Sequence, residues 1–339
     1  MTALSLNAMR PNALHRHPLF RPLAALAVLL LIDFLAIPGF FSLTIRDGHL
    51  YGSLVDILNR AAPLMLAALG MTLVIATRGI DISVGAVVAL SGTVAAMLVG
   101  GGPGPETPML MAMALALGAA LLCGLWNGML VASLGLQPIV ATLILMVAGR
   151  GLAQLLTDGQ IVTVYHAPYF FLGGGYFLGL PFSLTVVALV FAVTAFVMKY
   201  TALGLFIQAV GINPVAARLA GLRTAALIVS VYVFCAACAG MAGLMISSNI
   251  KSADANNAGL LLELDAILAV TLGGTSLAGG KFSLVGSVIG ALIIQTLTFT
   301  IYALGVPPEI NMVVKAGVVF LVCLSQSAEF KDLFARRMA

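Results

Sequence analysis

Long apolar stretches, separated by short polar segments, make up most of this chain. A helix of about 20 mostly apolar residues can cross roughly 30 Å of membrane hydrocarbon. About ten such stretches occur, near 22–41, 61–78, 84–100, 109–134, 138–157, 182–200, 225–248, 264–280, 284–304 and 307–325. Lipid cannot satisfy backbone polar groups, and these runs exceed the length of barrel strands, so helices are expected. The pattern predicts an all-α polytopic membrane protein with about ten transmembrane helices.

Two glycine-bracketed polar segments interrupt the apolar stretches: a first break at 77–85 and a second break at 273–281. The first break carries both an Arg and an Asp, and such groups at membrane depth cost roughly 2.5–3.5 kcal/mol each on insertion scales. They persist mostly where they face protein or water, and transporters often build a pathway at broken helices. We therefore expect some helices to be broken or re-entrant at these positions.

Seven polar side chains inside or beside apolar runs are candidates for lining a substrate path: Arg78, Asp81, Ser83, Asn127, Asp265, Thr275 and Ser276. Structural roles are open alternatives for some of them. Asp81 could cap the next helix, or Asp81 and Arg78 could neutralise each other. Asn127 could form an interhelical hydrogen bond. The polar external segment 251–259 could contact a hydroxyl-rich solute or be a solvated loop.

The composition excludes an ordinary soluble protein. Of 339 residues, 61% are hydrophobic and 8% are charged, and the mean hydropathy is +1.13. Soluble globular domains are typically about 25% charged. Since no polar linker separates the apolar stretches, residues 1–339 are expected to form a single transmembrane domain.

Basic residues gather in three regions: Arg10, Arg16 and Arg21; Lys199, Arg218 and Arg223; and Lys331, Arg336 and Arg337. Cytoplasmic loops carry an excess of Lys and Arg, so these regions are expected to be cytoplasmic. Both termini then lie inside, with tails at 1–21 and 326–339, and segment 158–181 lies outside. The basic residues set the topology and do not indicate nucleic-acid binding.

The cytoplasmic segment 201–224 contains signals for a short helix. Asn213 and Pro214 fit an N-cap and a first helical position, and Gly221 fits a helix stop. Between them Arg218 is the one charged residue, and Gly211 lies just before the cap. A short exposed helix between two spans indicates docking to a cytoplasmic partner.

Enzyme chemistry is not expected in this chain. Lys281 follows two glycines, but a phosphate-binding loop needs Gly at 275 and Ser or Thr at 282, where Thr275 and Phe282 stand. Neither a metal cluster nor a Ser-His-Asp arrangement is recognisable, so no catalytic residue, metal or cofactor is predicted. Cys235 and Cys238 have CxxC spacing within an apolar span, where packing is the better interpretation.

Three segments in the same order resemble ribose-type bacterial ABC sugar permeases. Residues 79–85, Gly-Ile-Asp-Ile-Ser-Val-Gly, are similar to the family signature, 209–221 to its cytoplasmic coupling segment, and 263–280 to its C-terminal glycine-rich block. The resemblance implies an importer permease of the inner membrane that works with a cytoplasmic ABC ATPase, a periplasmic sugar-binding protein and a second permease subunit. That second subunit could be an identical or a related chain.

Three further segments, 55–63, 139–151 and 253–260, resemble the galactofuranose-transporting members of this family. Arg78 departs from them, because a glycine is expected at that position. Two other functions remain as alternatives. An ion-driven secondary transporter would need intramembrane carboxylates, for which Asp33, Asp81 and Asp265 are the evident choices. A membrane enzyme acting on lipid-linked sugars would need a catalytic cluster that the sequence does not provide.

Overall fold

A computed structural model describes residues 19–46, 48–101 and 107–307, together with a few positions between 310 and 320. Helices dominate this part of the chain, and the strands form three short two-stranded sheets. The predicted helical character of the described part is thus confirmed. Most of the expected tail at 1–21, all of that at 326–339 and much of the span near 307–325 lie outside the described residues.

The helices and strands follow one another in the order α2 (Phe20–Ala36), β1 (Thr44–Arg46), β2 (His49–Tyr51), α3 (Ser53–Ala76), α4 (Val84–Ala96), η1 (Met97–Gly101), α5 (Met109–Ala132), α6 (Pro138–Leu156), β3 (Val162–Thr163), η2 (Ala167–Phe170), α7 (Phe171–Gly174), β4 (Tyr176–Phe177), β5 (Leu180–Pro181), α8 (Phe182–Tyr200), α9 (Ala202–Ile212), α10 (Pro214–Leu219), α11 (Thr224–Ile250), β6 (Ser252–Ala253), α12 (Leu262–Leu272) and α13 (Leu284–Ala303). The two predicted breaks separate α3 from α4 and α12 from α13.

Among the described residues, six helices are long and apolar enough to cross a membrane: α3, α5, α6, α8, α11 and α13. Three other predicted spans coincide with shorter helices, since α2 has 17 residues, α4 has 13 and α12 has 11. The count of about ten and the cytoplasmic location of both termini remain predictions. Short apolar helices that end at breaks fit the expectation of broken or re-entrant elements.

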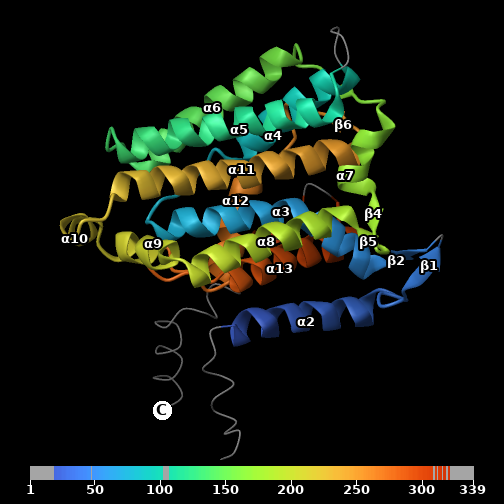
Figure 1. Ribbon diagram of the computed structural model, residues 1–339. Coiled ribbons are helices and arrows are strands. Elements are labelled where there is room, and N and C mark those ends of the chain that lie inside the picture. The colour runs from blue at the N-terminus through green and yellow to red at the C-terminus, as the bar shows by residue number, and fades with distance from the viewer. Residues whose placement is uncertain are drawn as a thin grey trace, which may run out of the picture.

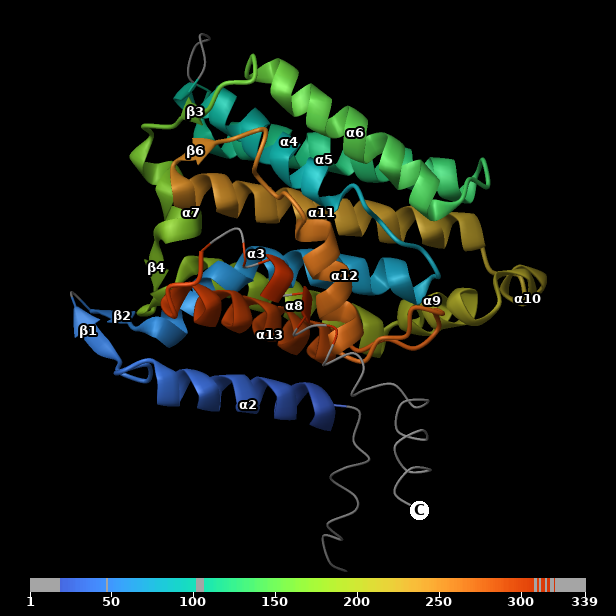
Figure 2. The same cartoon turned by 180° about the vertical axis from the view of Figure 1, so that it is seen from behind.

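Helix α3 lies at the centre of the molecule, among α11, α12, α13 and α8 (Figures 1 and 2). Small residues bring the neighbouring backbones close to one another. A Cβ atom on Gly70 would stand 2.8 Å from the Cα of Cys235, and one on Gly128 of α5 would stand 2.8 Å from the Cα of Val229. Close packing through small residues is how helices associate without a hydrophobic drive from water. Cys235 and Cys238 are both fully buried, which agrees with packing.

The molecule has two different ends. Figure 1 shows α9 and α10 at one end of the helix layers and β1, β2, β4 and β6 at the other. Strand β3 pairs with β6, with Val162 opposite Ala253, and so ties two distant loops together. Helix α2 lies outermost and packs on α13, where Thr300 Oγ1 donates to the buried Asp33 carboxylate at 2.6 Å. Asp33 thus has a hydrogen-bond partner on α13.

Candidate functional site

The first break is organised by the Asp81 carboxylate. Its Oδ1 accepts hydrogen bonds from Ser83 N at 2.9 Å and Ser83 Oγ at 2.6 Å. Ser83 is the N-cap residue of α4, so Asp81 holds the chain where that helix begins. A carboxylate beside the free N–H groups of a helix start is electrostatically favourable. Asp81 thus orients the N-cap residue and does not itself accept from the N–H groups of the first helical turn, as the capping interpretation would require.

Two further helices contribute polar groups to this first break. Asn127 of α5 donates through Nδ2 to Ser83 Oγ at 2.8 Å and to Asp81 Oδ1 at 3.5 Å. Thr142 of α6 accepts from Ile82 N at 3.1 Å. The side chains of Asp81, Ser83 and Asn127 are at most 2% exposed. We call these three residues the buried cluster; it pins the start of α4 inside the protein.

Arg78 does not belong to the buried cluster. Its Nη2 donates to Ile212 O at 2.6 Å and its Nε to Ala278 O at 3.0 Å. The Arg78 guanidinium thus bonds two backbone carbonyls, whereas Asp81 bonds Ser83 and Asn127. The predicted mutual neutralisation of Arg78 and Asp81 is therefore not seen in their hydrogen bonds. Arg78 has a left-handed backbone, φ 64°, a conformation that glycine adopts more readily. This geometry gives a physical basis for expecting glycine there.

The contacts of Arg78 form part of a tight junction between three segments. Gly280 N donates to Ala76 O at 2.9 Å, which joins the second break to the end of α3. A Cβ on Gly211 would collide with Ala76 O and stand 2.5 Å from Gly280 N. We call this place, defined by Ala76, Arg78, Gly211, Ile212, Ala278 and Gly280, the three-segment junction. It connects both breaks to the end of α9.

The remaining candidates of the second break differ in exposure. Thr275 is buried and its Oγ1 accepts from Ser283 N at 3.1 Å, just before α13 begins. Ser276 is exposed, and its Oγ accepts from Ala278 N at 3.2 Å. Thr275 therefore shapes the turn into α13, whereas Ser276 lies at the surface near the three-segment junction.

The predicted short helix after Asn213 is confirmed as α10. Asn213 Oδ1 accepts from Val215 N and Ala216 N, both at 3.0 Å, and Pro214 is the first helical residue. The helix stops before Gly221, which has φ 88°. Large apolar side chains project from α10 and the end of α9, since Leu219 is 84% exposed, Val215 68% and Ile212 63%.

The polar loop after β6 is held against α6. Arg150 Nη1 donates to Ala258 O at 2.6 Å and Ala255 O at 3.2 Å. Burial raises the pKa of the Asp254 carboxyl, but hydrogen bonds from Asn257 and Asn256 and the charge on Arg150 outweigh it, so that pKa lies below its ordinary value. This segment is thus an ordered loop with a carboxylate kept in its charged form.

Asp265 lies on α12, separate from the buried cluster, and is partly exposed. The nearby Glu263, which was not among the predicted path residues, is only 4% exposed and packs against Gly85 at the start of α4. A Cβ on Gly85 would collide with Glu263 Oε2. The two acidic residues, two positions apart on one short helix, thus face different surroundings.

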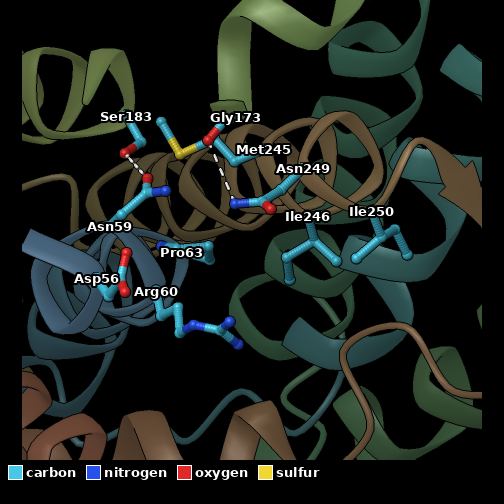
Figure 3. Close-up of a pocket in the computed structure, with 10 residues that line it drawn as sticks. All are labelled: Asp56, Asn59, Arg60, Pro63, Gly173, Ser183, Met245, Ile246, Asn249 and Ile250. Carbon is cyan, nitrogen blue, oxygen red and sulfur yellow. Dashed lines mark hydrogen bonds between the residues drawn. The ribbon is translucent and has the colours of Figure 1, made fainter. Parts of the chain in front are cut away.

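A polar cavity of about 310 Å³ opens at the end of the molecule opposite α10 (Figure 3). Its lining combines charged, amide and hydroxyl groups with aliphatic ones: Asp56, Asn59, Arg60, Pro63, Gly173, Ser183, Met245, Ile246, Asn249 and Ile250. Sequence reasoning selected none of these as site residues. The available signal was the spacing of Asp56, Asn59 and Arg60, which places three polar groups on one face at the start of α3.

Comparison with known proteins identifies the family. Residues 53–323 match the family described as "Branched-chain amino acid transport system / permease component". The chain is 52% identical to the galactofuranose transporter permease protein YtfT of Escherichia coli (strain K12), over 95% of this chain and 94% of that protein. It is 40% identical to the ribose import permease protein RbsC of the same strain, over 90% and 92%.

The fructose import permease protein FruF of Bifidobacterium longum (strain NCC 2705) is 38% identical, over 89% of this chain and 84% of that protein. No solved structure matches this chain. The predicted resemblance to ribose-type sugar permeases, and to the galactofuranose-transporting members, is confirmed. The chain belongs to the matched permease family, and within it to the sugar ABC transporter permeases, which are transport components and not enzymes.

Proposed function

We propose that this protein is the sugar-translocating subunit of an ABC importer in a bacterial inner membrane, and that ATP is hydrolysed by a separate cytoplasmic subunit. A periplasmic sugar-binding protein and a second permease subunit, identical or related, complete the transporter. The substrate is galactofuranose or a related pentose or hexose. The name and 52% identity of the galactofuranose permease support this choice of sugar.

One observation carries the coupling part of this proposal. Helix α10 presents exposed apolar side chains, and the segment that precedes it is tied through Ile212 O to Arg78. Arg78 also bonds the second break. A cytoplasmic ATPase that moves segment 201–224 would therefore displace both breaks together. Such rigid connections are how coupling between distant sites can be carried.

In this proposal the breaks shape the path, and their residues have different tasks. The buried cluster fixes the start of α4 as a hinge. Thr275 fixes the start of α13, and Asp265 and Ser276 remain candidates for contact with the sugar. Alternating access then requires α4, α12 and α13 to tilt about fixed helix starts, as broken helices do in other transporters.

Reconstitution into liposomes with the ATPase and the binding protein tests the proposal. Replacing Arg218 by Ala, or Gly221 by Val, should abolish sugar uptake while the protein still inserts. Lys199→Ala, which removes a charge at the same end outside segment 201–224, and Gly305→Val, at another exposed glycine with positive φ, are the matched controls. Normal uptake in both Arg218 and Gly221 variants would refute the coupling role.

Uptake by the purified protein alone, driven by an ion gradient without any ATPase, would instead favour a secondary transporter. Asp33, Asp81 and Asp265 are then the carboxylates to examine. Asp33 accepts a hydrogen bond from Thr300 and Asp81 from Ser83. The identity to sugar permeases over most of the chain argues for the ABC permease over the ion-coupled alternative.

A further inference from the structure

The cavity in Figure 3 is built by four helices, α3, α7, α8 and α11, that meet at the end opposite α10. Asp56, Asn59 and Arg60 stand on the first two turns of α3, and Asn249 on the last turn of α11. The 27-residue helix α11 begins next to α10, so at about 1.5 Å per residue it separates the cavity from the proposed ATPase side by roughly 40 Å. The cavity is therefore on the proposed external side.

We propose that this cavity is the entry subsite of the permease for a neutral, polyhydroxylated solute, where the sugar first contacts the membrane subunit. The inference rests on the proposed transport function and adds a site to it. Its volume of about 310 Å³ lies at the lower end of the range, roughly 300–1,000 Å³, of pockets for small ligands. A monosaccharide is the class of ligand that its lining fits.

Hydrogen bonds within the wall fix which atoms of two amides face the cavity. Ser183 Oγ donates to Asn59 Oδ1 at 2.5 Å, so the Asn59 NH₂ group is left to donate (Figure 3). Asn249 Nδ2 donates to Gly173 O at 3.2 Å, which leaves Asn249 Oδ1 to accept. One fixed donor group and one fixed acceptor suit a sugar, because each hydroxyl both donates and accepts.

The charged groups at the rim have the same complementary character. Asp56 supplies acceptors and Arg60 supplies donors, and both side chains are exposed. One carboxylate and one guanidinium leave the cavity with no net charge, which favours a neutral solute over a phosphorylated or carboxylated one. Ile246 and Ile250 add aliphatic surface for the C–H faces of a sugar ring.

The position of the cavity in the chain also fits entry. After Ile250 and Lys251 come β6 and then the Arg150-held loop 254–258, whose Asn256 and Asn257 are exposed. The amides of this loop already bond the protein, Asn256 to Gln154 and Gly159 and Asn257 to Asp254, whereas Asn59 and Asn249 each keep one amide group for a solute. The buried cluster lies deeper, where a solute could arrive only after the helices move.

The test uses the complete transporter in proteoliposomes, with ATP inside and sugar-saturated binding protein outside. The probes are radiolabelled D-galactose, which in water equilibrates between its pyranose and furanose forms, D-ribose and D-fructose. Asn59→Ala and Asn249→Ala should each lower the initial rate of uptake about tenfold, the factor expected for one lost hydrogen bond to the solute. The ATPase activity stimulated by loaded binding protein should remain near the parental value. Gln160→Ala, in an exposed loop outside the cavity, is the matched control.

The outcomes separate the subsite from the function. If the parent protein imports none of the three sugars, the proposed function fails. If the parent imports one of them and the Asn59 and Asn249 variants import it equally fast, the subsite is refuted and the function stands. If those variants lose ATPase activity as well, the exposed Asp56→Asn and Arg60→Gln variants decide: slower uptake with ATPase retained supports the subsite, and unchanged uptake refutes it.

Discussion

The two breaks look alike in sequence but differ in what surrounds them. In the first break, Asp81 and Ser83 are buried and bond each other and Asn127. In the second break, Ser276 and Ala278 are exposed, and Leu277 is 54% exposed. Asp81 and Ser83 of the first break hold a helix start within the protein. In the second break only Thr275 is buried at a helix start, and Ser276 and Lys281 are exposed. Glycine-bracketed polarity in a span therefore does not by itself identify a substrate path.

The largest expected effect is a difference in stability between a variant of the first break and a variant of the second. Asp81→Leu removes the acceptor of Ser83 N, Ser83 Oγ and Asn127 Nδ2 inside the protein, and each buried group left unsatisfied costs about 1–3 kcal/mol. Ser276→Ala in the second break should cost about 0.5 kcal/mol or less, as for most exposed sites. Thermal unfolding in detergent measures both.

Asp81→Asn is the control for this comparison, since it keeps an oxygen that can accept from Ser83 and changes little in volume. It should fall between the parent and Asp81→Leu in melting temperature. Equal melting temperatures for Asp81→Leu and Ser276→Ala would mean that the two breaks do not differ in the way their burial indicates.

The second prediction concerns the place where the breaks meet. Gly211→Ala puts a methyl group against Ala76 O and Gly280 N, and overpacking of this kind costs about 1–3 kcal/mol. Uptake should fall more steeply than stability, because the three-segment junction links α9 to both breaks. Gly151→Ala, on α6 with open space around it, should leave both properties unchanged. If the Gly211→Ala variant takes up sugar at the parental rate, close contact between α9 and the two breaks is not needed for transport.

Much of the fold could be predicted from the apolar pattern, because a long apolar segment in lipid must satisfy its backbone polar groups internally and does so as a helix. The cap at Asn213 and the stop at Gly221 are local signals, so α10 was predicted nearly to the residue. Burial of the first break was harder to foresee. Asn127 is 44 positions from Ser83 in sequence, and nothing local indicates that α5 packs against the start of α4.

The cavity and the contacts of Arg78 could not be predicted for the same reason. The cavity combines Asn59, Ser183 and Asn249, which lie on three helices and are brought together only by packing. Arg78 looked like a partner for the carboxylate three residues away. Its left-handed backbone instead directs the guanidinium to the carbonyls of Ile212 and Ala278, 134 and 200 positions away in the chain.

The smallest expected effect on stability, and the most informative one on coupling, comes from Arg78 itself. Arg78→Gly relieves a left-handed conformation that costs a non-glycine residue about 1–2 kcal/mol, and it loses two hydrogen bonds at an exposed site worth about the same. The melting temperature should hardly change. Sugar imported per ATP hydrolysed should fall about threefold, within the range by which residues along a coupling route modulate it.

Arg78→Lys separates the two contributions. Lysine keeps the charge and the backbone strain but lacks the planar fork that reaches both carbonyls, so it should melt below Arg78→Gly while showing a similar loss of coupling. Uptake per ATP is measured in the proteoliposomes described above, and Lys199→Ala is again the control. If Arg78→Gly imports as much sugar per ATP as the parent, the guanidinium only stabilises the junction, and the two breaks respond to the ATPase through Gly211 and Gly280 alone.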